Sequence, residues 1–193
     1  MTVDAGRARL ACALLAICSS TADAQEQVRA CGVERWPVKI LADKDRASVD
    51  FTPRATTIKE LGAIPIPEVP YPYDRRLAPH ELRVYRVRAT IQRIVTEDDS
   101  DLHLILRDPT DTTATLIAEI PASSCALGTE RGTSYDSVRA VAQSVPRGAV
   151  VEVEGVAFFD FIHNQLGRAR NGIEIHPVLS ITATVPQSFT GGR

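Results

Sequence analysis

Four side chains able to do acid–base or metal chemistry lie close together in the last third of the chain. They are two carboxylates, Asp160 and Glu174, and two imidazoles, His163 and His176. Such a set can bind a divalent cation or transfer protons. All four are candidate catalytic residues, and His163, Glu174 and His176 are the candidate metal ligands. The alternative is a structural polar network, in which His176 bonds to Glu174 or to a backbone carbonyl.

A β-hairpin is expected to position these residues. Residues 150–160 and 173–181 are rich in β-branched and aromatic side chains, and the polar loop between them contains Gly167 and an Asn171-Gly172 pair. Two such runs joined by a glycine-containing loop indicate an antiparallel pair of strands. A long loop at the end of a hairpin is also a common place for functional residues.

Strand alternation predicts which side chains meet. It places Glu174, His176 and Val178 on one face of the second strand, and Asp160 beside Glu174 at the end of the first. Both histidines are then within side-chain reach, so the four residues are expected to form one coupled cluster. Three polar residues of neighbouring strands could join it, although alternation alone does not show that they converge: Asp101, His103 and Glu119.

The sequence contains none of the common catalytic signatures. It has no H-E-x-x-H pair, G-x-S-x-G elbow, P-loop or dinucleotide-binding glycine pattern. Whether the protein is an enzyme is therefore left open. The enzymatic alternative is a metal-dependent or acid–base hydrolase, for example a nuclease, that uses the carboxylates and histidines of the hairpin.

The first 24 residues have the pattern of a signal peptide. Arginines precede an apolar run at 10–18, and small residues around Ala24 form an A-x-A cleavage site. The apolar run is too short to span a bilayer, so no membrane span is expected after cleavage. Lipidation of Cys18 is the alternative. The sequence thus predicts a secreted or periplasmic protein.

Export would leave two cysteines, Cys31 and Cys125, in the mature chain. In an oxidising compartment these can form one intramolecular disulfide. Closing a loop of that length contributes about 4–5 kcal/mol on the chain-entropy model. The alternative is a pair of unpaired, buried thiols.

Residues 25–79 are predicted to form an extended, proline-rich strap. The segment shows no sustained helix or strand period, apart from one or two helical turns at 56–61. We expect it to pack against the following domain through four apolar side chains, and the alternative is a polyproline II ligand for a partner's aromatic groove. The four anchors are Trp36, Ile64, Ile66 and Tyr71.

Residues 80–185 are predicted to form a mainly β domain, followed by a flexible tail at 186–193. Three alternating strands precede a helix with Ser134 as its N-cap, and two further strands follow it. Gly155 interrupts the fourth strand and indicates a bend. This order is typical of an OB-fold, a five-stranded barrel with a helix between its third and fourth strands, with a β-sandwich as the alternative.

Several strings resemble a group of small exported bacterial proteins of unassigned function. The F-F-D-F-x-H string at 158–163 and the N-G-I-E-x-H-P-V-L string at 171–179 are the most specific, and similar strings occur at 34–39, 101–104 and 118–121. Where that group tends to have H-G-Q, this chain has His163-Asn164-Gln165. The resemblance implies export and a shared fold, and it brings no activity.

A binding module is the function that the sequence favours. The ligand is an unknown small molecule or protein, no cofactor is identified beyond the candidate divalent metal, and the net charge of −2 makes nucleic acid the less favoured partner. Positive charge could also come from Arg93, Arg168 and Arg170. The candidate ligand-binding residues are Arg86, Arg88, Phe158 and Gln165.

Overall fold

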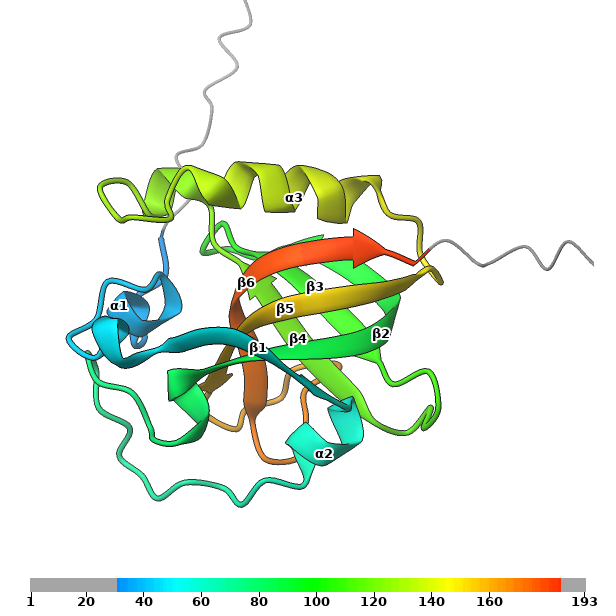
Figure 1. The fold of residues 1–193 in the computed structure, drawn as a ribbon, viewed down its shortest axis with the longest axis horizontal. Coiled ribbons are helices and arrows are strands. Elements are labelled where there is room, and N and C mark those ends of the chain that lie inside the picture. Colours follow the sequence, from blue (N-terminus) through cyan, green and yellow to red (C-terminus); the bar gives the residue numbers. More distant parts are fainter. Residues whose placement is uncertain (1–30, 185–193) are drawn as a thin grey trace, which may run out of the picture.

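The computed structural model describes residues 31–184 and contains one sheet of six strands. The strand order is β1-β2-β3-β4-β6-β5, and a further pairing of β2 with β5 closes the last five strands into a barrel (Figure 1). The strands are β1 (Asp50–Thr56), β2 (Arg83–Thr96), β3 (Leu102–Arg107), β4 (Thr115–Ile120), β5 (Val150–Phe159) and β6 (Ile173–Ala183).

The barrel confirms the predicted OB-like fold. Helix α3 (Ser134–Ser144) lies between β4 and β5, which are the third and fourth strands of the barrel. The helix buries Val138 and Ala142, whereas Val141 is exposed. The predicted N-cap is wrong by one residue: Thr133 holds that position, and the Ser134 hydroxyl donates to the Arg131 carbonyl oxygen instead.

Strand alternation decides which side chains fill the barrel. In β2 the residues Tyr85, Val87, Ala89 and Ile91 are buried in the core, as the sequence predicted. The inward residues of the other strands complete the core: Leu102, Leu104, Leu106, Leu116, Ala118, Ile120, Val151, Val153, Ala157, Phe159, Ile173, Ile175, Val178 and Ile181.

A bulge in β6 changes the predicted alternation. Gly155 pairs with Val178 while Ala157 pairs with Ile175, so one residue of β5 faces two residues of β6. The extra residue reverses the alternation after His176, and Val178 points into the core. The prediction that Val178 shares a face with Glu174 and His176 is therefore wrong.

Gly155 lies at a close approach of β5 to β6. A Cβ atom at this position would meet the side chain of Ile175 and would lie 2.5 Å from the Pro177 carbonyl oxygen. A residue without a side chain is needed for such a close approach of two backbones.

The strap contains more regular structure than the sequence suggested. It includes α1 (Trp36–Lys39), η1 (Arg46–Ser48) and α2 (Ile58–Gly62), and its strand β1 pairs in parallel with β2, while η2 (His80–Leu82) directly follows the strap. The prediction of a strap without a regular strand is thus wrong for β1. Helix α2 overlaps the predicted helical turns, extends one residue past them and begins with a capping box between Thr57 and Glu60.

Three of the four predicted strap anchors pack as expected. Tyr71 is buried in the core cluster, and Trp36 and Ile64 are partly buried against it. Ile66 is 53% exposed, so it does not anchor the strap. The side-chain amide of Asn171 adds a polar anchor, since it donates to the carbonyl oxygens of Leu61 and Ile64 at 2.9 Å each.

Covalent and ionic links hold the strap to the barrel. The predicted disulfide between Cys31 and Cys125 is present. Arg35 makes a two-pronged ion pair with Glu81 and donates to the Phe159 carbonyl oxygen, whereas the buried pair of Arg76 with Asp43 lies within the strap itself. The first part of the strap therefore lies tightly against the barrel.

The predicted signal peptide and the predicted C-terminal tail lie outside the described residues. Among the residues that are described, no helix is long and apolar enough to cross a membrane.

Candidate functional site

The outer face of β3, β4 and β6 carries a row of ionisable side chains, which we call the buried polar cluster. Its members come from positions that alternate with the core residues, so they point out of the barrel, yet each is at most 5% exposed. The cluster consists of Asp101, His103, Glu119, Asp160, Glu174 and His176.

Strand register brings the centre of the cluster together. His103 of β3 is opposite Glu119 of β4. The parallel pairing of Ile117 with Glu174 then sets Glu119 level with His176 of β6. Asp101 immediately precedes β3 and reaches the same place.

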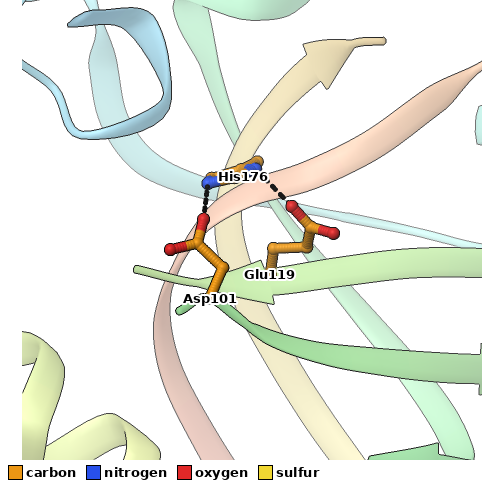
Figure 2. Close-up of side chains that lie close together, drawn as sticks. All are labelled: Asp101, Glu119 and His176. Atoms are coloured by element: carbon orange, nitrogen blue, oxygen red, sulfur yellow. Dashed lines mark ion pairs between the residues drawn. The ribbon is translucent and has the colours of Figure 1, made fainter. Parts of the chain in front are cut away.

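His176 lies between two carboxylates (Figure 2). Its Nε2 atom is 3.3 Å from Asp101 Oδ2, and its Nδ1 atom is 3.0 Å from Glu119 Oε2. Glu119 Oε1 in turn lies 2.8 Å from the Nδ1 atom of His103. An imidazolium at His176 would thus have an anion at each nitrogen.

The electrostatic environment favours this charged form. Burial by itself disfavours the imidazolium, but Asp101 and Glu119 outweigh burial and raise the pKa of His176. Burial would also disfavour the Glu119 carboxylate, but the bonds from His103 and His176 outweigh that effect and lower the pKa of Glu119. The imidazole and the carboxylate thus stabilise each other's charge.

Glu174 has the opposite character. Its side chain is fully enclosed, and burial together with the nearby carboxylates of Glu119 and Asp160 raises its pKa well above the ordinary value. The neutral acid is the form that this environment favours. Glu174 is therefore more readily protonated than an ordinary glutamate.

The strap covers the cluster with two cations. The guanidinium of Arg35 lies 4.8 Å from the ring centroid of Phe158, and the ammonium of Lys39 lies 5.3 Å from it. Burial lowers the pKa of Lys39, but the carboxylates of Glu119, Asp160 and Glu174 outweigh burial and raise it. Strap and cluster thus neutralise each other's charges.

The structure brings together only part of the predicted four-residue cluster. Glu174 and Asp160 interact electrostatically, but His176 contacts Asp101 and Glu119 rather than either of them. His163 is half exposed, with its Nδ1 atom 3.9 Å from Asp160 Oδ2 and bonded to the Phe161 carbonyl oxygen. The parallel pairing of β4 with β6 is the physical reason for the different partners of His176, because it brings Asp101 and Glu119 to the ring.

Most of the predicted ligand-binding residues are not available to a ligand. Phe158 does face outward from the barrel, but it is completely buried under the strap. Arg86 is engaged with Glu154 at 2.6 Å. Gln165 is partly buried in the 160–172 loop, and of the four only Arg88 is largely exposed to solvent.

The donors around His176 match those of metal sites in type. Asp101, Glu119 and His176 each offer one ligand atom, and these atoms lie within 4.8 Å of one another. The three residues are each 5% exposed or less, so a cation held there would be enclosed. A protonated imidazole would face a carboxylate at each nitrogen, although neither nitrogen forms a hydrogen bond of good geometry in the structure.

The cluster also lacks the access that a hydrolase requires. Asp160, Glu174 and His176 are enclosed, and of the four candidate catalytic residues only His163 reaches solvent. A substrate bond could not approach the carboxylates without removal of the strap. The enclosed arrangement is that of a structural polar network.

An open groove lies on the same outer face, at the other end of β3 and β4. It has a volume of about 830 Å³ and is bounded by β2, β3, the start of β4, the segment after α3 and the 160–172 loop. The loop approaches β3 closely at Gly167, where a Cβ atom would lie 2.5 Å from the Ile105 side chain. Gly167 also has a φ of +87°, so glycine suits this position for two reasons.

Three arginines line this groove, and sequence reasoning did not single out two of them. Arg93 had been noted for its charge, whereas Arg107 and Arg147 had no local signal, because only the closed barrel brings them together. No ion pair joins any of the three to a carboxylate in the described part of the chain. The Nε atom of Arg107 is buried and has no hydrogen-bond partner.

Comparison with known proteins gives only partial structural likenesses. No family model and no curated protein matches the chain. A protein assigned as an aspartyl-tRNA synthetase from Leishmania major Friedlin is similar over 68% of this chain and 21% of its own, with 14% identity and a TM-score of 0.44. The Entamoeba histolytica asparaginyl-tRNA synthetase is similar over 52% of this chain and 20% of its own, with 9% identity and a TM-score of 0.34. The fold assignment stands on the strand order and the place of α3.

Proposed function

We propose that this protein is an exported binding module that takes an anionic ligand into the groove lined by Arg93, Arg107 and Arg147. The observation that carries the proposal is the set of three arginines that line one open groove and form no ion pair among residues 31–184. A cleft lined by charges of one sign attracts ligands of the opposite sign.

The position of the groove supports a binding role. OB-folds commonly bind ligands on the face of their second and third strands, next to the loop between the fourth and fifth. Here those strands are β3 and β4, and the corresponding loop supplies Leu166 and Gly167 to the groove. The volume of about 830 Å³ is within the usual range of small-molecule sites, roughly 300–1,000 Å³.

The lining sets the chemistry of the ligand. Guanidinium groups bind carboxylate, sulfate and phosphate through paired N–H donors. Among the described residues, none that lines the groove is acidic, while Ile94, Ile105 and Leu166 provide apolar walls. A ligand with an anionic group on a less polar body fits both features.

Export is the second part of the proposal. It rests on the signal-like first 24 residues and is supported by the disulfide, which is typical of oxidising compartments. N-terminal sequencing of protein recovered from outside the cytoplasm should begin at Gln25. Recovery of the uncleaved chain from the cytoplasm would contradict this part.

Titration with inorganic sulfate tests the binding site directly. In NMR spectra of arginine Nε–H groups, the signals of Arg93, Arg107 and Arg147 should shift together and saturate. Arg88 is the internal control, because it is an exposed arginine of β2 outside the groove. Equal, non-saturating shifts at Arg88 would show only general ion association, and Arg107→Gln should abolish the saturable response.

A further inference from the structure

A second pocket adjoins the arginine groove. It has a volume of about 410 Å³ and lies between α2, the β3–β4 turn and the 160–172 loop. Thr115 lines both the groove and this pocket. The 160–172 loop also passes from one to the other, since Leu166 and Gly167 line the groove and residues 168–170 line the pocket. The two hollows are thus neighbours on one surface.

The second pocket repeats the charge pattern of the groove. It contains Lys59, Arg168 and Arg170, and its one carboxylate, Asp111, lies 3.3 Å from Lys59. The guanidinium of Arg168 donates one hydrogen bond among the described residues, to the neighbouring Ala169 carbonyl oxygen at 3.4 Å. The guanidinium groups of Arg168 and Arg170 have no ion-pair partner within residues 31–184.

We propose that the groove and the second pocket form one extended site for a linear acidic oligosaccharide, with anionic groups bound on both sides of Thr115. This inference rests on the proposed anion-binding function and adds the class of ligand. Unmatched arginines in two adjoining hollows suit a chain that carries repeated carboxylate or sulfate groups.

The neutral part of the lining favours sugar over nucleic acid. Gln92, Thr113 and Thr115 offer donors and acceptors for hydroxyl groups. Single-stranded nucleic acid is usually held by bases stacked on aromatic side chains. No aromatic residue is among the described residues that line either hollow.

Calorimetric titration with oligogalacturonates of one to eight units tests the extended site. Affinity should rise about tenfold or more between the monomer and the length that reaches both hollows, and then level off. In the double variant Arg168→Gln/Arg170→Gln this dependence on length should disappear while monomer binding remains. Arg88→Gln is the matched control and should behave as the wild type.

The possible results separate the two proposals. Saturable sulfate binding at Arg107 with no dependence on oligomer length would overturn the extended site and leave the anion-binding function standing. Loss of both responses would overturn both proposals. Equal affinity for neutral maltooligosaccharides, or tighter binding of oligothymidylate of equal charge, would overturn the assignment to an acidic sugar. Thermal melts of each variant establish that the exposed substitutions leave the fold intact.

Discussion

The two ends of one barrel face differ in whether their charged side chains are paired and enclosed. At the end near Asp101, the ionisable groups are enclosed by the strap, and His176 and Lys39 lie among carboxylates. At the other end, Arg107 and its neighbours face an open groove with no carboxylate. The same strands, β3 and β4, supply both ends. The difference indicates that matched, enclosed charges hold the strap in place, whereas the unmatched charges are free for a ligand.

The largest effect should come from removing the cation at the centre of the buried polar cluster. His176→Gln leaves Asp101 and Glu119 without their shared partner, and we expect it to lower the free energy of unfolding by about 3–5 kcal/mol. Urea denaturation at neutral pH measures this loss. His163→Gln is the matched control and should change stability by no more than about 0.5 kcal/mol, because His163 is half exposed.

A double-mutant cycle sharpens this assignment. Coupling of His176 to Glu119 should be clear, whereas coupling of His176 to Glu174 should be small, since only the first pair is in contact. The reverse pattern would contradict the described network. A chelator-dependent melting temperature in the wild type would show that an ion, rather than a proton, holds the cluster together.

A smaller loss is expected where β5 and β6 approach each other. Gly155→Val adds a side chain against Ile175 and the Pro177 carbonyl, and overpacking of this kind costs about 1–3 kcal/mol. The bulge lies directly after His176, so the substitution should also weaken the polar cluster. An unchanged melting temperature would contradict the described contact, and Gly62→Ala, at a position with open space, serves as the control.

A change of pH should alter the free energy of unfolding by an amount similar to, or smaller than, the loss expected for Gly155→Val. The pKa of His176 is raised in the folded protein, so its contribution is fully present below the unfolded value, near 6.5, and is lost as the pH rises through the folded pKa. The pKa of Glu174 is also raised in the folded protein, so its contribution to stability is likewise lost as the pH rises above the unfolded value near 4.5. Stability should therefore fall as the pH rises above about 6.5, by at most about 1.4 kcal/mol per pH unit for each proton.

Glu119 governs how the free energy of unfolding changes with pH on the acid side. Its pKa is lowered in the folded protein, so its contribution is present above the unfolded value and is lost as the pH falls through the folded pKa. Urea unfolding between pH 4 and pH 9 measures both sides. Glu174→Gln should flatten the alkaline side and leave the acid side unchanged, and a profile identical to the wild type would contradict the assignment to Glu174.

The smallest effect on stability is expected in the groove. Arg93→Gln and Arg147→Gln remove exposed charges without ion-pair partners, so each should change the free energy of unfolding by no more than about 0.5 kcal/mol. Sulfate binding should weaken in both variants. A large loss of stability would show that the groove, like the buried cluster, is part of the framework.

The sequence by itself determined the barrel. Regular alternation placed Leu102, Leu104 and Leu106 inside because successive side chains in a strand point to opposite faces. The place of α3 between the third and fourth barrel strands, and the two cysteines, followed from patterns read directly along the chain. The same alternation placed His103 and Phe158 on the outer face.

Tertiary structure alone decided what covers that outer face and which charges meet there. Alternation does not distinguish an outer face in water from one under the strap, and it could not show that Phe158 is enclosed by Arg35 and Lys39. A bulge shifts the register by one residue, and the parallel pairing of β4 with β6 has no local signal. Both arise from contacts between distant segments, and for that reason the true partners of His176 came from the neighbouring strands rather than from its own hairpin.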